Sequence, residues 1–137
     1  MSQTDRRFRL LIDVSAAADL SRVRREDRWA HAQIVTVLQE YESGALPAEE
    51  LIDERFESKQ IENIKPFWHL QDKRLNVYRI KLVSVNAWRI LTAGDHAYRE
   101  VAVLAIMRRD QNYQSDKALI ERLRKSYENF GFKRLGF

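Results

Sequence analysis

The chain has no cysteine, only four glycines and two prolines, and no long hydrophobic run. Without cysteine there can be neither a disulfide framework nor a zinc site built on thiolates. No apolar stretch reaches the roughly 18 residues of a membrane-spanning helix, and the charged start lacks a secretory-type hydrophobic segment. The scattered glycines form no phosphate-binding loop, and no spacing of histidines or carboxylates suggests a metal site. We therefore expect a soluble, cytoplasmic protein with no membrane partner, no metal and no cofactor.

A length of 137 residues fits one compact domain, because domains commonly run from about 50 to 250 residues. Hydrophobic residues make up 45% of the chain and charged residues 32%, which is an ordinary balance for a folded protein. There is no internal repeat and no low-complexity segment. The sequence thus predicts a single domain over residues 1–137.

Charge is unevenly distributed along the chain, although the net charge is only +4. Residues 15–72 hold seven basic and twelve acidic side chains, whereas residues 73–113 hold eight basic and three acidic ones. A basic half of this kind favours a polyanionic partner, such as a nucleic acid. The simpler alternative is a solvated surface whose cations only keep the protein in solution.

The first half of the chain predicts a strand followed by two helices. Residues 8–14 are apolar and partly β-branched, as in a short strand. Apolar residues recur at three- and four-residue steps over 15–43, which predicts a long helix, and a second helix follows over 47–59. The short turn between them predicts an antiparallel pair. No period is clear over residues 60–73, where Pro66 excludes a continuous helix.

The second half predicts three antiparallel strands and a final helix. Residues 75–83, 87–92 and 98–107 are rich in apolar residues, and short polar turns separate them. Residues 115–130 carry an apolar stripe at helical spacing, and Ser115 can cap this helix. The expected fold class is α+β: an N-terminal strand, an antiparallel helical hairpin, a three-stranded antiparallel meander and a C-terminal helix.

Basic side chains gather on these three strands. Arg79 and Lys81 share one face of the first strand, because side chains alternate between the two faces of a sheet. Arg89 lies on the neighbouring strand, and Arg108 and Arg109 leave the end of the third. Neighbouring strands lie about 4.8 Å apart, so these groups can converge on one surface that would bind a phosphodiester.

Three short motifs, in their order, resemble those of a known family. Residues 78–82 (YRIKL) and 88–91 (WRIL) are followed by an apolar strand that ends in residues 108–113 (RRDQNY). This pattern is similar to that of the RelE/ParE superfamily of toxins from type II toxin–antitoxin systems. The RelE and HigB branches are mRNA interferases, endoribonucleases that cut mRNA on the ribosome without a metal. The resemblance therefore implies this activity, a RelE-like fold, and a cognate antitoxin, mRNA and the ribosome as partners.

The resemblance also implies roles for individual residues. Arg79 and Lys81 resemble the paired basic strand residues that hold the RNA backbone and assist deprotonation. Arg89 resembles the arginine that meets the scissile phosphate. Either Arg108 or Arg109 takes the place of a second arginine.

A tyrosine and three polar residues complete the expected site. Tyr113 resembles the terminal tyrosine that stacks on a base or orients it. Three residues that flank the basic strands are expected to contact the substrate: Lys73, Arg74 and Gln111.

Physical chemistry sets a condition on such a site. Metal-free RNA cleavage needs a base for the 2′-hydroxyl proton, donors for the charge of the phosphorane and a proton for the leaving oxygen. The basic strands contain no histidine, and only the loop residue His69 and the turn residue His96 are candidates. Otherwise lysine or tyrosine would serve, after neighbouring arginines lower its pKa by about three units.

Two other functional classes share the expected fold. A ParE-like toxin inhibits DNA gyrase, and the cluster of Arg79, Lys81, Arg89 and Tyr113 is not expected there. A non-catalytic phage or chromosomal protein would keep the fold as a binding module. Cleavage of mRNA on programmed ribosomes, inhibition of supercoiling, or neither would distinguish the three classes.

Overall fold

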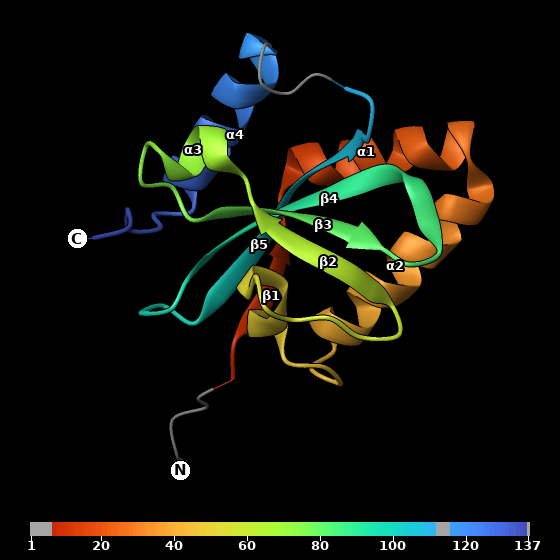
Figure 1. Cartoon of the computed structure of the whole chain (residues 1–137), viewed down its shortest axis with the longest axis horizontal. Coiled ribbons are helices and arrows are strands. Elements are labelled where there is room, and N and C mark those ends of the chain that lie inside the picture. Colours follow the sequence, from red (N-terminus) through yellow and green to blue (C-terminus); the bar gives the residue numbers. More distant parts are fainter. Residues whose placement is uncertain (1–6, 112–115, 137) are drawn as a thin grey trace.

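The chain folds as an α+β protein, the class predicted from the sequence, with one mixed sheet between helices (Figure 1). The computed structural model describes residues 7–111 and 116–136. The elements follow one another in this order: β1 (Arg9–Ile12), α1 (Val14–Glu26), α2 (Arg28–Glu42), the 3₁₀ helix η1 (Ala48–Ile52), β2 (Ile61–Pro66), α3 (Trp68–Gln71), β3 (Val77–Leu82), β4 (Val85–Asp95), β5 (Glu100–Arg108) and α4 (Lys117–Asn129). No helix within these described residues is long and apolar enough to cross a lipid bilayer.

The sheet has five strands in the order β1-β5-β4-β3-β2. Its central strands β3, β4 and β5 are antiparallel neighbours. At one edge β1 pairs with β5 in parallel, and at the other β2 pairs with β3 antiparallel. The expected three-stranded antiparallel meander is therefore wrong as a description of the sheet, which is mixed and larger by one strand at each edge.

The strand β2 escaped prediction because its buried residues do not alternate. Ile61 and Ile64 are both buried although they are three residues apart. A register shift between Ile61 and Asn63 explains this spacing, since a β-bulge inserts one extra residue and resets the alternation of side chains. Pro66 ends the strand, as proline is tolerated at the edge of a sheet.

The long helix expected over residues 15–43 is two helices that meet at Asp27. The backbone of Asp27 (φ −156°, ψ 87°) is not helical, and its carboxylate accepts a hydrogen bond from the Ala30 N–H at 3.0 Å. Its own N–H still donates to the Val23 carbonyl at 2.7 Å, so one residue ends α1 and caps α2. Aspartate favours this arrangement, because its side chain competes with the helical backbone for hydrogen bonds.

The second expected helix, over residues 47–59, is only the five-residue helix η1. The helix stops because side chains satisfy the backbone that follows it. Asp53 accepts a hydrogen bond from the Arg55 N–H at 3.0 Å, and Ser58 accepts one from the Ile61 N–H at 3.1 Å. The expected antiparallel helical hairpin is therefore wrong, and α1 and α2 take the place of its first helix.

Each face of the sheet has its own hydrophobic core. One core joins the sheet to α1, α2 and η1, and we call this face the α1 side. The other joins the sheet to α3, α4 and the residue Phe132, and we call this face the α4 side. The central strands supply alternate residues to the two cores: Ile80, Ile90 and Ile106 to the α1 side, and Leu91, Ala105 and Met107 to the α4 side.

Side chains satisfy the edge of β5 beyond the end of β1. The strand β1 pairs with β5 only as far as Val103. Beyond that point the Asp19 carboxylate accepts a hydrogen bond from the Ile106 N–H at 2.9 Å, and Arg122 donates to the Leu104 carbonyl at 3.1 Å. Arg122 also forms an ion pair with Asp19 at 2.6 Å. One buried carboxylate thus links α1, β5 and α4.

The last helix, α4, is capped at both ends, and its N-cap lies one residue later than expected from the sequence. Asp116 is the N-cap and accepts a hydrogen bond from the Leu119 N–H at 2.9 Å. The expected cap, Ser115, lies outside the described residues. At the other end Phe130 is the C-cap, and Gly131 follows it at φ +74°, a conformation that glycine adopts without strain.

Candidate functional site

The register of the sheet places Arg79 and Arg89 on the same side. Arg79 lies opposite Leu91, and Arg89 lies opposite Met107. Both partners belong to the core of the α4 side. Because residues that pair across strands share a face, both arginines leave the sheet on the α4 side.

Lys81 joins this side near the turn between β3 and β4. Its neighbours Ile80 and Leu82 both belong to the core of the α1 side, so Lys81 points away from them. Its ammonium forms an ion pair with Glu62 of β2 at 2.5 Å, and a quarter of its side chain (25%) is exposed. A phosphate that approaches Lys81 therefore competes with a carboxylate that is already in place.

Lys65 is a member of the same surface that the sequence did not reveal. It lies opposite Arg79 in the pairing of β2 with β3, and its side chain is exposed. Its neighbour Ile64 belongs to the α1 side, so Lys65 faces the α4 side. The sequence of this segment has no clear hydrophobic period. The signal that could have revealed Lys65 is its position directly before Pro66, since proline is typical of an edge strand.

Arg108 and Arg109 face opposite sides of the sheet. Arg108 lies opposite Trp88, a member of the core on the α1 side, and its guanidinium lies over the Trp88 ring, 4.8 Å from the centroid. Arg108 also forms an ion pair with Glu26 of α1. Arg109 continues the ladder by one residue, since its N–H donates to the Ala87 carbonyl at 2.8 Å. Alternation then turns the exposed Arg109 toward the α4 side. The structure thus separates the two arginines that the sequence left as alternatives.

Arg89 is the most enclosed of these cations, with 7% of its surface exposed. Its guanidinium donates to the carbonyls of Asn86 at 2.8 Å and Trp88 at 3.0 Å. Backbone carbonyls of the first residues of β4 therefore stabilise this buried charge. Arg89 can meet a phosphate only if the ligand reaches into the sheet or if the guanidinium swings away from these carbonyls.

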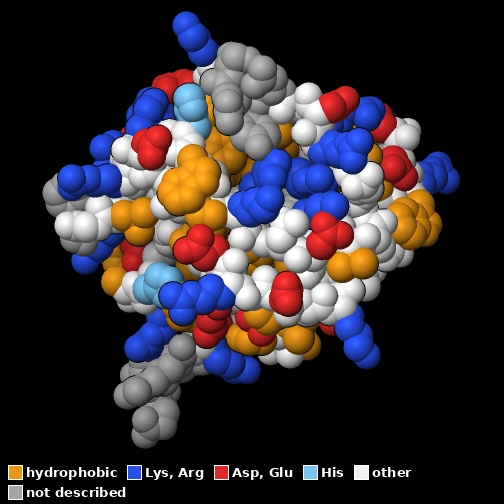
Figure 2. Space-filling model, in the orientation of Figure 1, with side chains coloured by type: hydrophobic (Ala, Val, Ile, Leu, Met, Phe, Trp, Pro, Cys, Tyr) orange, Lys and Arg blue, Asp and Glu red, His pale blue; other side chains and the backbone are white. Residues whose placement is uncertain are grey.

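Five cations from β2, β3, β4 and the residue that directly follows β5 thus share the α4 side, and we call them the basic face: Lys65, Arg79, Lys81, Arg89 and Arg109. Figure 2 shows Lys and Arg side chains gathered in the middle of the molecule, over the region where β3 and β4 lie in Figure 1. Neighbouring strands are about 4.8 Å apart, so several of these groups can contact successive phosphates of one strand.

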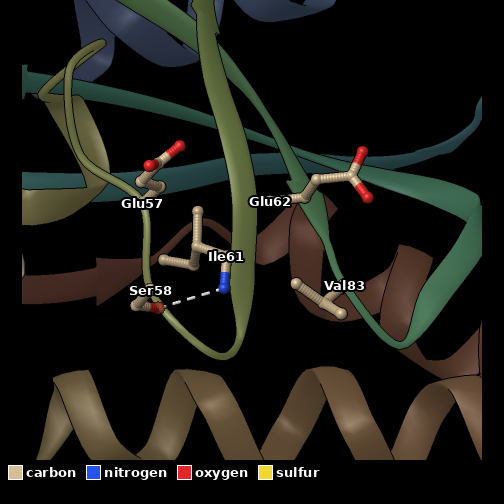
Figure 3. Close-up of a pocket in the computed structure, with 5 residues that line it drawn as sticks. All are labelled: Glu57, Ser58, Ile61, Glu62 and Val83. Atoms are coloured by element: carbon tan, nitrogen blue, oxygen red, sulfur yellow. Dashed lines mark hydrogen bonds between the residues drawn. The ribbon is translucent and has the colours of Figure 1, made fainter.

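An acidic hollow borders the basic face where β2 begins. It has a volume of about 390 Å³ and is lined by Glu57, Ser58, Ile61, Glu62 and Val83 (Figure 3). The two glutamates extend on opposite sides of β2 in this view. Because the Glu57 carboxylate repels phosphate, the hollow limits how far a polyanion on the basic face can extend beyond Glu62.

Of the two expected site residues that follow Arg109, the structure describes Gln111 but not Tyr113. The Gln111 side chain donates to the Asp116 carboxylate at 2.7 Å, so it links the end of β5 to the start of α4 rather than the basic face. The hydrogen bond from the Leu119 N–H, followed by that from Gln111, lowers the pKa of Asp116. Tyr113 lies outside the described residues.

Lys73 and Arg74 precede β3, and so lie at the end of this strand away from Lys81. The Arg74 carbonyl accepts a hydrogen bond from the Leu135 N–H at 2.6 Å, which places this residue at the C-terminal segment. The pKa of Glu121 on α4 is lowered mainly by a hydrogen bond from Arg124, and the charge of Lys73 contributes to the same shift.

The described histidines and the tyrosines with a shifted pKa are not members of the basic face. His96 lies in the turn between β4 and β5, at the end of β4 away from Arg89, and its ring contacts Phe8 edge-on at 5.5 Å. His69 is an exposed residue of the short helix α3. Burial raises the pKa of each of the tyrosines whose pKa shifts in the described chain: Tyr41, Tyr78 and Tyr127.

Comparisons with protein-family models, with curated proteins and with solved structures found no match to the chain. No group of three or more His, Asp or Glu residues that could hold a metal ion occurs within residues 7–111 and 116–136. The basic face offers several guanidinium donors for a phosphodiester, and the Glu62 carboxylate lies at its margin.

Proposed function

We propose that the chain is a RelE-like toxin of a type II toxin–antitoxin system, an endoribonuclease that cleaves mRNA on the ribosome without a metal and inhibits translation. A cognate antitoxin would neutralise it. The observation that carries the proposal is the basic face, in which cations from β2, β3, β4 and the residue that directly follows β5 share the α4 side. The order of β1, the helices, the strands β3, β4 and β5, and α4 also supports membership of the RelE/ParE superfamily.

The cations of the basic face differ in the task that their surroundings allow. Lys65 and Arg79 lie opposite each other and can hold the phosphates of the strand that enters the face. Arg109 is exposed and can donate to the scissile phosphate, whose negative charge grows in the phosphorane. The enclosed Arg89 lies on β4, between β3 and β5, and adds positive potential to the face whether or not it touches the ligand.

The base that the reaction needs is the Glu62 carboxylate in this proposal. Glu62 is 45% exposed and forms its ion pair with Lys81 at 2.5 Å. The carboxylate takes the proton of the attacking 2′-hydroxyl, and the 2′-oxygen bonds to phosphorus as the bond from phosphorus to the 5′-oxygen breaks, which leaves a 2′,3′-cyclic phosphate. The Lys81 ammonium, which separates from Glu62 when the phosphate binds, gives a proton to the leaving 5′-oxygen. A carboxylate is a weak base at neutral pH, which fits a slow catalyst whose substrate is held in position by the ribosome.

Adjacent arginines provide a matched test. Purified wild-type protein, Arg109→Gln and Arg108→Gln would be added to ribosomes programmed with a defined mRNA, and cleavage would be followed by primer extension. We expect Arg109→Gln to slow cleavage at least tenfold, because its guanidinium faces the α4 side. Arg108→Gln should retain the wild-type rate, because this arginine contacts Glu26 and Trp88 on the α1 side.

Each other outcome of this test has a definite meaning. Absence of cleavage by the wild-type protein would refute the proposal, and so would equal rates for the two variants once thermal melting shows both to be folded. Inhibition of DNA gyrase supercoiling without mRNA cleavage would indicate a ParE-like activity. Neither activity would leave a non-catalytic binding module.

A further inference from the structure

The junction of α1 and α2 forms a second basic surface, separate from the basic face. A hollow of about 500 Å³ lies there, lined by Ser21, Arg24, Arg25 and Arg28. We call these four residues the arginine elbow. All four are exposed. The turn at Asp27 creates this arrangement, since it brings the end of one helix and the start of the next around one hollow.

The carboxylates next to the elbow are already engaged elsewhere. Glu26 forms ion pairs with Arg22 and with Arg108, and Asp27 accepts the capping hydrogen bond from the Ala30 N–H. Among the described residues, no carboxylate lies within ion-pair distance of the three arginines of the elbow. Their charge is therefore available to an anion from solution, and three guanidinium groups around one hollow suit phosphate oxygens.

The position of the elbow also favours a nucleic-acid strand. Trp29 follows Arg28 and is 59% exposed, so it offers a surface on which a base can stack. The ion pair between Arg108 and Glu26 joins the end of β5 to the end of α1. Arg109, a member of the basic face, directly follows Arg108, the residue that contacts α1. The acidic hollow borders the basic face at the start of β2. A bound RNA strand is therefore repelled less if it leaves the face past Arg109 than if it leaves past β2.

We infer that the arginine elbow is a second contact for the phosphodiester backbone of single-stranded RNA, which continues from the basic face around the end of β5. The inference rests on the proposed function for the identity of the strand. The contact is electrostatic and independent of base sequence, apart from stacking on Trp29. It anchors the RNA and takes no part in the cleavage chemistry.

Salt-dependent binding tests this inference. The probe is a fluorescein-labelled single-stranded 2′-O-methyl RNA, which has no 2′-hydroxyl to support cleavage, and its anisotropy gives Kd over a range of salt concentrations. The elbow variant carries Arg24→Gln, Arg25→Gln and Arg28→Gln. The control variant removes the same number of charges at exposed positions elsewhere: Arg55→Gln, Lys59→Gln and Lys125→Gln.

We expect the elbow variant to bind at least tenfold more weakly and to lower the slope of log Kd against log salt by about 2, since each lost phosphate contact removes roughly 0.7. The control variant should keep the wild-type slope. Equal losses in the two variants would show that net charge alone is responsible, and would overturn the inference. Tighter binding of polyglutamate than of RNA at the elbow would overturn it as well.

The same proteins separate this inference from the proposed function. Binding through the elbow without any cleavage of ribosome-bound mRNA would refute the proposed function and retain the second contact. Cleavage by the wild-type protein together with identical RNA binding by the elbow and control variants would retain the proposed function and overturn the second contact.

Discussion

Replacement of Asp19 by alanine should destabilise the fold through the edge of β5. The Asp19 side chain is 8% exposed and accepts hydrogen bonds from the Ile106 N–H at 2.9 Å and from Arg122 at 2.6 and 3.2 Å. A hydrogen bond to a charged group contributes about 1.5–3 kcal/mol. The Arg122 side chain is 31% exposed, so its ion pair adds at most about 1 kcal/mol after solvent screening. The expected loss in the free energy of unfolding is therefore about 3 kcal/mol.

Urea denaturation followed by far-UV circular dichroism measures this loss, and two further variants divide it. Asp19→Asn keeps an oxygen for the Ile106 N–H and should cost about half as much as alanine. Arg122→Gln leaves the Asp19 hydrogen bond to Ile106 intact and should cost about 1 kcal/mol. A loss below about 1 kcal/mol for Asp19→Ala, with an unchanged denaturant dependence, would refute the assignment of Asp19 as the link between α1, β5 and α4.

Three further predictions concern the helix junction, the proposed base and a buried phenol. Asp27→Ala should cost about 1 kcal/mol in urea denaturation because it removes the cap of α2, whereas Asp27→Asn should cost little; equal costs would contradict the capping role. Glu62→Gln should slow mRNA cleavage by about 100-fold while RNA binding persists, and the neighbouring Glu57→Gln, which lacks the contact with Lys81, should leave the rate unchanged; similar rates for these two variants would exclude Glu62 as the base. Burial raises the pKa of Tyr127 above its ordinary value of 10.0, so the protein is stabilised below that pH and loses this stability as pH rises through the folded-state pKa. Denaturation at about pH 9 and pH 11 should show a smaller pH effect in Tyr127→Phe than in the wild-type protein, and an equal effect in both would contradict the assignment.

Strand and helix identities could be predicted where the apolar pattern is regular. The strands β3, β4 and β5 and the helix α4 lie within or near their expected ranges, because short apolar runs bounded by turns mark the strands and an apolar stripe at helical spacing marks α4. The strand β2 could not be found in this way, since its bulge places Ile61 and Ile64 on one face at a spacing of three. The apolar period also continues across Asp27, so hydrophobicity alone does not reveal the junction of α1 and α2.

The candidate site was less accessible to prediction because pairing register decides it. Period two in the sequence is enough to place Arg79 and Lys81 together. The choice between Arg108 and Arg109 depends on which of them lies opposite Trp88, and no local pattern contains that information. The ion pair between Lys81 and Glu62 likewise joins two strands, one of which had no recognisable pattern. Long-range pairing therefore determines the site more than the sequence of any one strand.

The parallel pairing of β1 with β5 has a consequence for how the chain is completed during translation. Arg9 contacts Glu100, 91 residues later in the chain, through a hydrogen bond that cannot form earlier. At about 5–20 residues per second, synthesis leaves β1 and α1 without their partner strand for on the order of ten seconds. During this interval the faces of β1 and α1 that pack on β5 lack their partner and are accessible to chaperones. Arg109 emerges from the ribosome later still, so nascent chains that stop before it can fold only in part and carry no complete basic face.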